Sequence, residues 1–163
     1  MSSTGDSTLS REETLVQYVL VRRDLQTSLG WPLGSVIAQG CHAVSALMWE
    51  KRENSNVAKY CANIDSMHKV MRSPAPSSSS LPPGSLLSPY HASSRTGTKF
   101  CTQVVLGVKD SKELLKFAQK LSDADMQHRV WVEQPENDPT ALAVLPYPRS
   151  QIQPLLKKLP LLK

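Results

Sequence analysis

The sequence has few cysteines and no long apolar segment. Its three cysteines, Cys41, Cys61 and Cys101, are widely spaced, which argues against a disulfide framework and favours a reducing compartment. The cysteines and the four histidines do not show zinc-ligand spacing, and no P-loop or dinucleotide-binding glycine motif is present. The longest apolar segment, at 15–21, is far shorter than the ~20 residues of a membrane-spanning helix. No secretory leader is visible, so we expect a cytoplasmic protein without metal, cofactor or membrane partner.

Length and composition predict one folded domain with two polar segments. Residues 1–14 and 72–100 are too polar to join a core, and the second segment is rich in serine and proline. We expect 1–14 to be a disordered tail and 72–100 to be a disordered insertion within a single domain at 15–163. The rest of the chain, about 120 residues, has a normal domain size. A net charge of +5 permits an anionic partner without requiring one.

Hydrophobic patterns predict an α/β fold. Strands are predicted in four segments that are rich in β-branched residues or alternate in polarity: 16–22, 102–108, 127–133 and 140–145. Helices are predicted from Ser35 to about Arg52, from about Asn56 to Met71, after an Asp110–Glu113 capping box, and after Pro148. Pro154 means that the last helix is either distorted or starts at Pro154 itself. Residues 25–34 are predicted to be a loop. The order β-α-α-β-α-β-β-α predicts a three-layer α/β/α fold with a mixed, roughly four-stranded sheet.

Polar residues gather where the first strand ends and the first long helix begins. Gln39 and His42 are three residues apart, on one helix face, one turn inside the N-terminus. That N-terminus offers free N–H groups to a phosphate or carboxylate. Arg22, Arg23 and Asp24 end the preceding strand, near the sheet edge where α/β proteins usually bind ligands. A purely structural role for Gln39 and His42, as hydrogen-bonding helix residues, stays open.

A second candidate cluster follows the strand at 127–133. Glu133 and Glu136 are carboxylates that could act as a base or orient a water. The spacing alone favours the alternative, a solvated turn capped by Asn137 and Asp138. Trp31 and Trp131 could stack on a nucleotide base, although buried packing is the commoner role of tryptophan.

Two motifs resemble the peptidyl-tRNA hydrolase type 2 family. The segment VRRDL at 21–25 is similar to that family's V-R-x-D-L, and GSVIAQGCHA at 34–43 is similar to its G-K-x-A-A-Q-x-x-H-A. Three further segments are more similar to a divergent eukaryotic branch, the peptidyl-tRNA hydrolase domain-containing proteins: WP at 31–32, EQPEN at 133–137 and PYP at 146–148. The resemblance covers nearly the whole predicted core and implies that family's mixed four-stranded α/β fold.

The resemblance implies hydrolysis of the ester between a peptide or N-acyl-amino acid and the 3′ end of tRNA. Such a reaction needs a positioned water, a base and donors for the oxyanion. Catalytic roles are implied for Gln39, His42, Glu133 and Asp24. Contacts with tRNA phosphates are expected from cations that flank strand ends at the same edge: Arg22, Arg23 and Lys109.

Two positions depart from the family pattern. The lysine at the start of the family's helix is Ser35 here, which removes a cation beside the oxyanion or phosphate. The family's acidic loop, Asp-Ala-Gly with a nearby Thr, falls at 133–135, with Asn137 and Thr140 as looser matches. A second hypothesis therefore stays open, in which the protein is a non-catalytic RNA- or protein-binding module that retains the fold.

Overall fold

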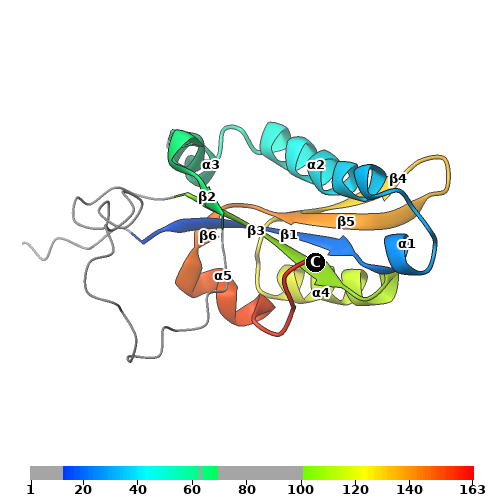
Figure 1. Cartoon of the computed structure of the whole chain (residues 1–163). Coiled ribbons are helices and arrows are strands. Elements are labelled where there is room, and N and C mark those ends of the chain that lie inside the picture. Colours follow the sequence, from blue (N-terminus) through cyan, green and yellow to red (C-terminus); the bar gives the residue numbers. More distant parts are fainter. Residues whose placement is uncertain (1–12, 63, 70–100) are drawn as a thin grey trace, which may run out of the picture.

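The computed structural model describes residues 13–62, 64–69 and 101–163, and in these residues six strands form one mixed sheet (Figure 1). The strands are β1 (Leu15–Arg22), β2 (His68–Lys69), β3 (Thr102–Val108), β4 (His128–Glu133), β5 (Asp138–Val144) and β6 (Tyr147–Pro148). Their spatial order is β2-β3-β1-β5-β4, and β6 pairs with β1. The central strand β1 is parallel to β3 and antiparallel to β5. The predicted α/β class and mixed sheet are confirmed.

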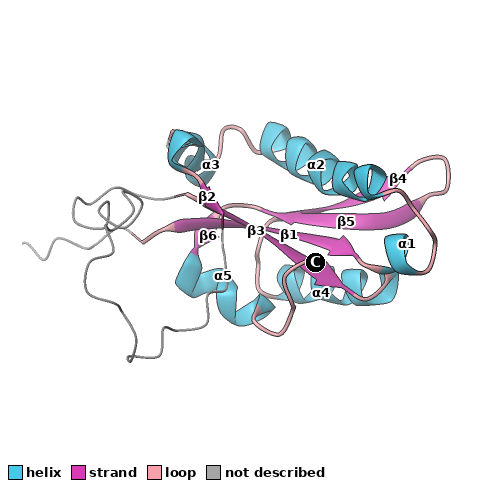
Figure 2. Cartoon of the chain, viewed as in Figure 1, coloured by secondary structure: helices cyan, strands magenta, loops and turns pink. Residues whose placement is uncertain are grey.

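Helices cover both faces of the sheet. They are α1 (Asp24–Thr27), α2 (Leu33–Glu50), α3 (Ser55–Cys61), α4 (Ser111–Asp123) and α5 (Arg149–Leu156), with a 3₁₀ turn at Ile64–Ser66. In Figures 1 and 2, α2 and α3 lie on one face, and α4 and α5 lie on the other. The alternation of β1 supplies both cores, because Val19 and Val21 pack with α2 and α3, whereas Tyr18 and Leu20 pack with α4 and α5. None of the helices in the described residues is long and apolar enough to cross a membrane.

The region between β1 and α2 differs from the prediction. The loop predicted at 25–34 contains the one-turn helix α1, and α2 begins at Leu33 instead of Ser35. Pro32 is the N-cap of α2, with an extended ψ of 143°. A proline suits this end of a helix, because its missing N–H would have no partner inside the helix. Gly30 has a φ of +70°, a conformation that favours glycine, so the expected turn residue is present.

Three other helices also test the predictions. The Asp110 cap is confirmed, because the Glu113 N–H donates to Asp110 Oδ1 over 2.9 Å. Helix α5 begins at Arg149 and contains Pro154, so a start at Pro154 is wrong. Helix α3 ends at Cys61, well short of the predicted end.

Three expectations concern residues that the structure does not describe. The predicted disorder of the tail and of the insertion falls on residues 1–12 and 72–100, which lie outside the described residues. The predicted end of the second helix, at residues 70–71, lies outside them too.

Candidate active site

An open pocket of about 430 Å³ lies between the first turns of α2 and the β4–β5 hairpin. It is lined by Trp31, Pro32, Ser35, Ala38, Gln39, His42, Glu133, Gln134 and Glu136. Three residues predicted to be catalytic therefore meet: Gln39, His42 and Glu133. Glu133 is the last residue of β4, and the turn that follows ends at Asn137, whose φ of +55° is a conformation that asparagine tolerates.

Gln39 is held in one orientation by two hydrogen bonds. Its Nε2 donates to the Ser35 carbonyl oxygen over 3.3 Å, and its Oε1 accepts from the Thr140 hydroxyl over 2.7 Å. A carbonyl oxygen can only accept, which fixes the NH₂ end of the amide at Ser35 and makes Thr140 the donor at the other end. Gln39 is 3% exposed and Thr140 is 0% exposed. One N–H of the Gln39 amide remains for a ligand in the pocket.

Trp131 contacts both of the other predicted catalytic residues. Its indole Nε1 donates to Glu133 Oε2 over 2.9 Å. Its ring centroid is 5.0 Å from that of His42, with a tilt of 32° between the two planes. Within the described part of the chain, Glu133 Oε1 accepts no hydrogen bond, so this oxygen is open to a water. From the sequence we considered base stacking or buried packing for Trp131, and the hydrogen bond to Glu133 was not predicted.

Asp24 and Arg22 belong to a separate, partly buried network. Arg22 Nε and Nη2 donate to the two carboxylate oxygens of Asp24 over 3.0 and 2.8 Å. Arg22 Nη1 donates to Asp138 Oδ1 over 2.5 Å and to the Pro139 carbonyl over 3.0 Å. The hydrogen bond to Asp24 raises the pKa of the Arg22 guanidinium above its already high value, so this charge is permanent.

The position of this network bears on two of the predicted roles. Arg22 is only 4% exposed, and Asp24 is not among the residues that line the pocket. Arg22 joins the end of β1 to the start of β5, and Asp24 holds the Arg22 guanidinium. Their geometry favours a structural role over a phosphate contact for Arg22 and over base catalysis for Asp24.

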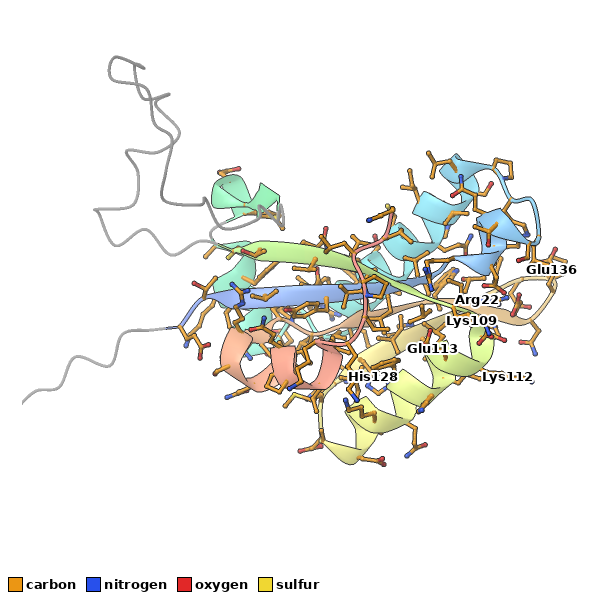
Figure 3. The ribbon with its side chains drawn as sticks, turned by 60° about the horizontal axis from the view of Figure 1, so that its bottom comes forward. Arg22, Lys109, Lys112, Glu113, His128 and Glu136 are labelled. Carbon is orange, nitrogen blue, oxygen red and sulfur yellow. The ribbon has the colours of Figure 1, made fainter. Side chains whose placement is uncertain are left out.

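Arg23 and Lys109 are exposed at the carboxyl ends of the neighbouring strands β1 and β3. Backbone hydrogen bonds join these ends, because the Arg23 N–H donates to the Val108 carbonyl over 2.9 Å and the Asp24 N–H donates to the Lys109 carbonyl over 3.3 Å. In the described residues neither side chain forms an ion pair. Figure 3 shows Lys109 at the same end of the molecule as Arg22 and Glu136. Two free cations therefore flank the edge that carries the pocket.

The charges in the pocket limit its chemistry. Glu133 and Glu136 line it, and no lysine or arginine among the described residues does. Neutral donors at the pocket include the Gln39 amide and the first N–H groups of α2. In the part of the chain that the structure describes, no group of three or more His, Cys, Asp or Glu side chains is arranged to hold a metal ion. The arrangement can orient a water and stabilise a developing oxyanion.

Comparison with known proteins gives the family. The family model described as "Peptidyl-tRNA hydrolase PTH2" matches residues 15–81 and 87–162. The chain therefore belongs to the peptidyl-tRNA hydrolase PTH2 family, as the motifs predicted. Relatives from Homo sapiens and Mus musculus, both named "Putative peptidyl-tRNA hydrolase PTRHD1", are each 30% identical over 152 residues. The match covers 93% of this chain and 84% of each relative.

Proposed function

We propose that the protein hydrolyses the ester that joins a peptide or N-acyl-amino acid to the 3′ end of tRNA, and that it acts in translation in the cytoplasm. Membership of the family supports the tRNA substrate and the reaction class. The observation that carries the proposal is the pocket, in which an open carboxylate oxygen of Glu133 faces the same space as the buried amide of Gln39. Three free cysteines are consistent with a reducing compartment.

In the proposed reaction, Glu133 Oε1 accepts a proton from a water while Trp131 holds Oε2. The water oxygen forms a bond to the ester carbonyl carbon, and the carbonyl electrons move onto the oxygen. The free N–H of Gln39 donates to that oxyanion. The bond to the 3′ oxygen of tRNA then breaks, and this oxygen takes a proton. His42, stacked on Trp131 at the pocket, is the group that we assign to deliver it. Glu133 then releases its proton to solvent and His42 takes one up from solvent, which restores both residues.

The tRNA phosphates bind outside the pocket in this proposal. Two carboxylates line the pocket and repel a phosphate, whereas Arg23 and Lys109 are exposed at the adjacent strand ends and form no ion pair with any described residue. Arg22 and Asp24 hold the backbone beneath them.

The test is release of an N-blocked amino acid from tRNA by the purified protein, with and without a metal chelator. We expect turnover that the chelator does not change. Glu133→Gln should lower turnover ~10²-fold or more, because it keeps the shape of the side chain and removes the base. Glu136→Gln is the matched control, since Glu136 is an exposed carboxylate of the same pocket, and its turnover should stay within a few-fold of wild type.

Two results would contradict the proposal in different ways. Full activity of Glu133→Gln would show that this carboxylate is not the base. No turnover by the wild-type protein, with tRNA still bound, would favour the non-catalytic RNA-binding module.

A further inference from the structure

The most exposed large apolar side chain in the described residues is Trp49, near the C-terminal end of α2. It is 73% exposed. A tryptophan stabilises a fold by burying its large ring, and this one buries little of it. The fold of the described residues therefore gives no reason for a tryptophan at this position.

Trp49 lies on the same line along α2 as two residues of the pocket. Ser35 and His42 both line the pocket, and the spacing from Ser35 to His42 and from His42 to Trp49 is seven residues in each case. Seven residues of an α-helix fall about 20° short of two full turns and span about 10 Å. Ser45 and Ala46 lie between His42 and Trp49 and are small, so no long side chain of α2 blocks the way. Long helical side chains lean toward the helix N-terminus, which here is the pocket end.

A cation already lies on the Trp49 ring. The Arg52 guanidinium carbon is 4.8 Å from the indole centroid, and Arg52 Nη1 donates to the Trp49 carbonyl oxygen over 3.0 Å. Two carboxylates nearby are paired with cations: Glu50 with Arg129 at 2.6 Å and with Lys51 at 3.6 Å, and Glu53 with Arg52 at 3.6 Å. Three cations against two carboxylates favour an anionic strand over a peptide as the occupant.

We infer that Trp49 and Arg52 form a stacking platform for an unpaired base in the single-stranded 3′ end of tRNA, on the path into the pocket. The inference rests on the proposed function, which places the terminal ester beside Gln39 and Glu133. At ~3.4 Å per stacked nucleotide, about three nucleotides span the distance from the platform to His42. Stacking on an aromatic ring tolerates any base, because every base has a π-face, and a neighbouring arginine strengthens it.

The test measures RNA binding without turnover. The probes are an acceptor-stem RNA hairpin with an unpaired 3′ tail and the same hairpin with the tail removed. Trp49→Ala should weaken binding of the tailed hairpin by roughly 5- to 20-fold and leave binding of the blunt hairpin unchanged. Trp49→Phe keeps a ring and should stay within about threefold of wild type. Leu115→Ala, at an exposed apolar residue of α4 on the opposite face, should change neither affinity.

Three outcomes would overturn the platform. One is wild-type affinity of Trp49→Ala for the tailed hairpin. Another is an equal loss on both hairpins, which indicates a duplex contact or a folding defect. The third comes from the release assay: a KM that Trp49→Ala raises for a peptidyl-tRNA but not for an N-blocked aminoacyl-tRNA indicates a peptide-binding surface.

The platform and the proposed function fail separately. A wild-type protein that releases no amino acid but needs Trp49 to bind the tail refutes the hydrolase and supports the platform. A protein that releases amino acid but binds the tail without Trp49 refutes only the platform.

Discussion

Replacing Thr140 with valine tests whether the Gln39 amide is the oxyanion donor. Valine has nearly the shape of threonine but no hydroxyl, so Gln39 Oε1 would stay buried without the donor that now lies 2.7 Å away. A buried acceptor that loses its partner costs about 1–3 kcal/mol of stability. In a domain of this size, we expect the unfolding midpoint to fall by roughly 2–10 °C.

The same substitution should lower kcat. Without Thr140, the Gln39 side chain keeps only the longer bond to the Ser35 carbonyl, at 3.3 Å, and its amide is free to turn. Removing an oxyanion donor outright costs ~10²–10³ in kcat, so losing its orientation should cost ~10- to 100-fold with little change in KM. Thr140→Ser keeps the hydroxyl and is the control, with a kcat near that of wild type.

A double-mutant cycle tests whether Thr140 acts through Gln39. If Thr140 acts only through Gln39, adding Thr140→Val to Gln39→Leu should lower kcat no further. Independent, multiplicative losses in the double mutant would show that Thr140 acts elsewhere. Wild-type kcat in Thr140→Val, together with the expected loss of stability, would show that the Gln39 amide is structural and that the oxyanion is stabilised by another group.

Three other predictions concern the residues around the pocket. Trp131→Phe keeps an aromatic ring and removes the N–H that binds Glu133. Because a hydrogen bond to a charged group contributes about 1.5–3 kcal/mol, kcat should fall by ~10-fold or more. An unchanged kcat would show that Glu133 does not need this hydrogen bond. Arg23→Ala and Lys109→Ala should each reduce the slope of the logarithm of the tRNA binding constant against the logarithm of salt concentration by about one unit, with kcat at saturation nearly unchanged. An unaltered slope would exclude a phosphate contact by that residue. Burial raises the pKa of the Cys101 thiol, so a thiol reagent should label only the two exposed cysteines of the native protein. The unfolded thiol ionises first, so the stability that the buried neutral thiol contributes should be lost as the pH rises above about 8.5.

Local patterns predicted the long strands and the capped helix, because the signals lie within a few residues of each other. The β-branched and aromatic residues of β1 and the Asp110 cap are examples. Helix α1 was missed, because a single turn is too short to show a helical period. The two-residue strands β2 and β6 were missed for the same reason, since the pairing with β3 and β1 defines them.

The site residues divide in a similar way. The family motifs indicated Gln39, His42 and Glu133, and the structure brings these together in one pocket. The burial of Arg22 was not predictable from its surroundings in the sequence, because its partner Asp138 is 116 residues away on β5. Two adjacent arginines at the end of a strand look equally exposed until the opposite strand is known.

The hydrogen-bond partners of the two candidate acids, Asp24 and Glu133, favour different roles for them. Both oxygens of Asp24 accept from the Arg22 guanidinium, which also binds Asp138, so this carboxylate is held in an ion-pair network outside the pocket. In the described residues, Glu133 accepts from a neutral indole on one oxygen only, so its other oxygen is open and no lysine or arginine lining the pocket offsets its charge. No lysine or arginine of the described residues lines the pocket, so in the proposed reaction the oxyanion would be stabilised by neutral donors. The orientation of the Gln39 amide by Thr140 would then matter more than it would beside a cation. The same negative charge disfavours phosphates in the pocket, so under the proposed function the binding energy for tRNA comes from the surfaces around it: the cations at the strand ends and the exposed ring on α2.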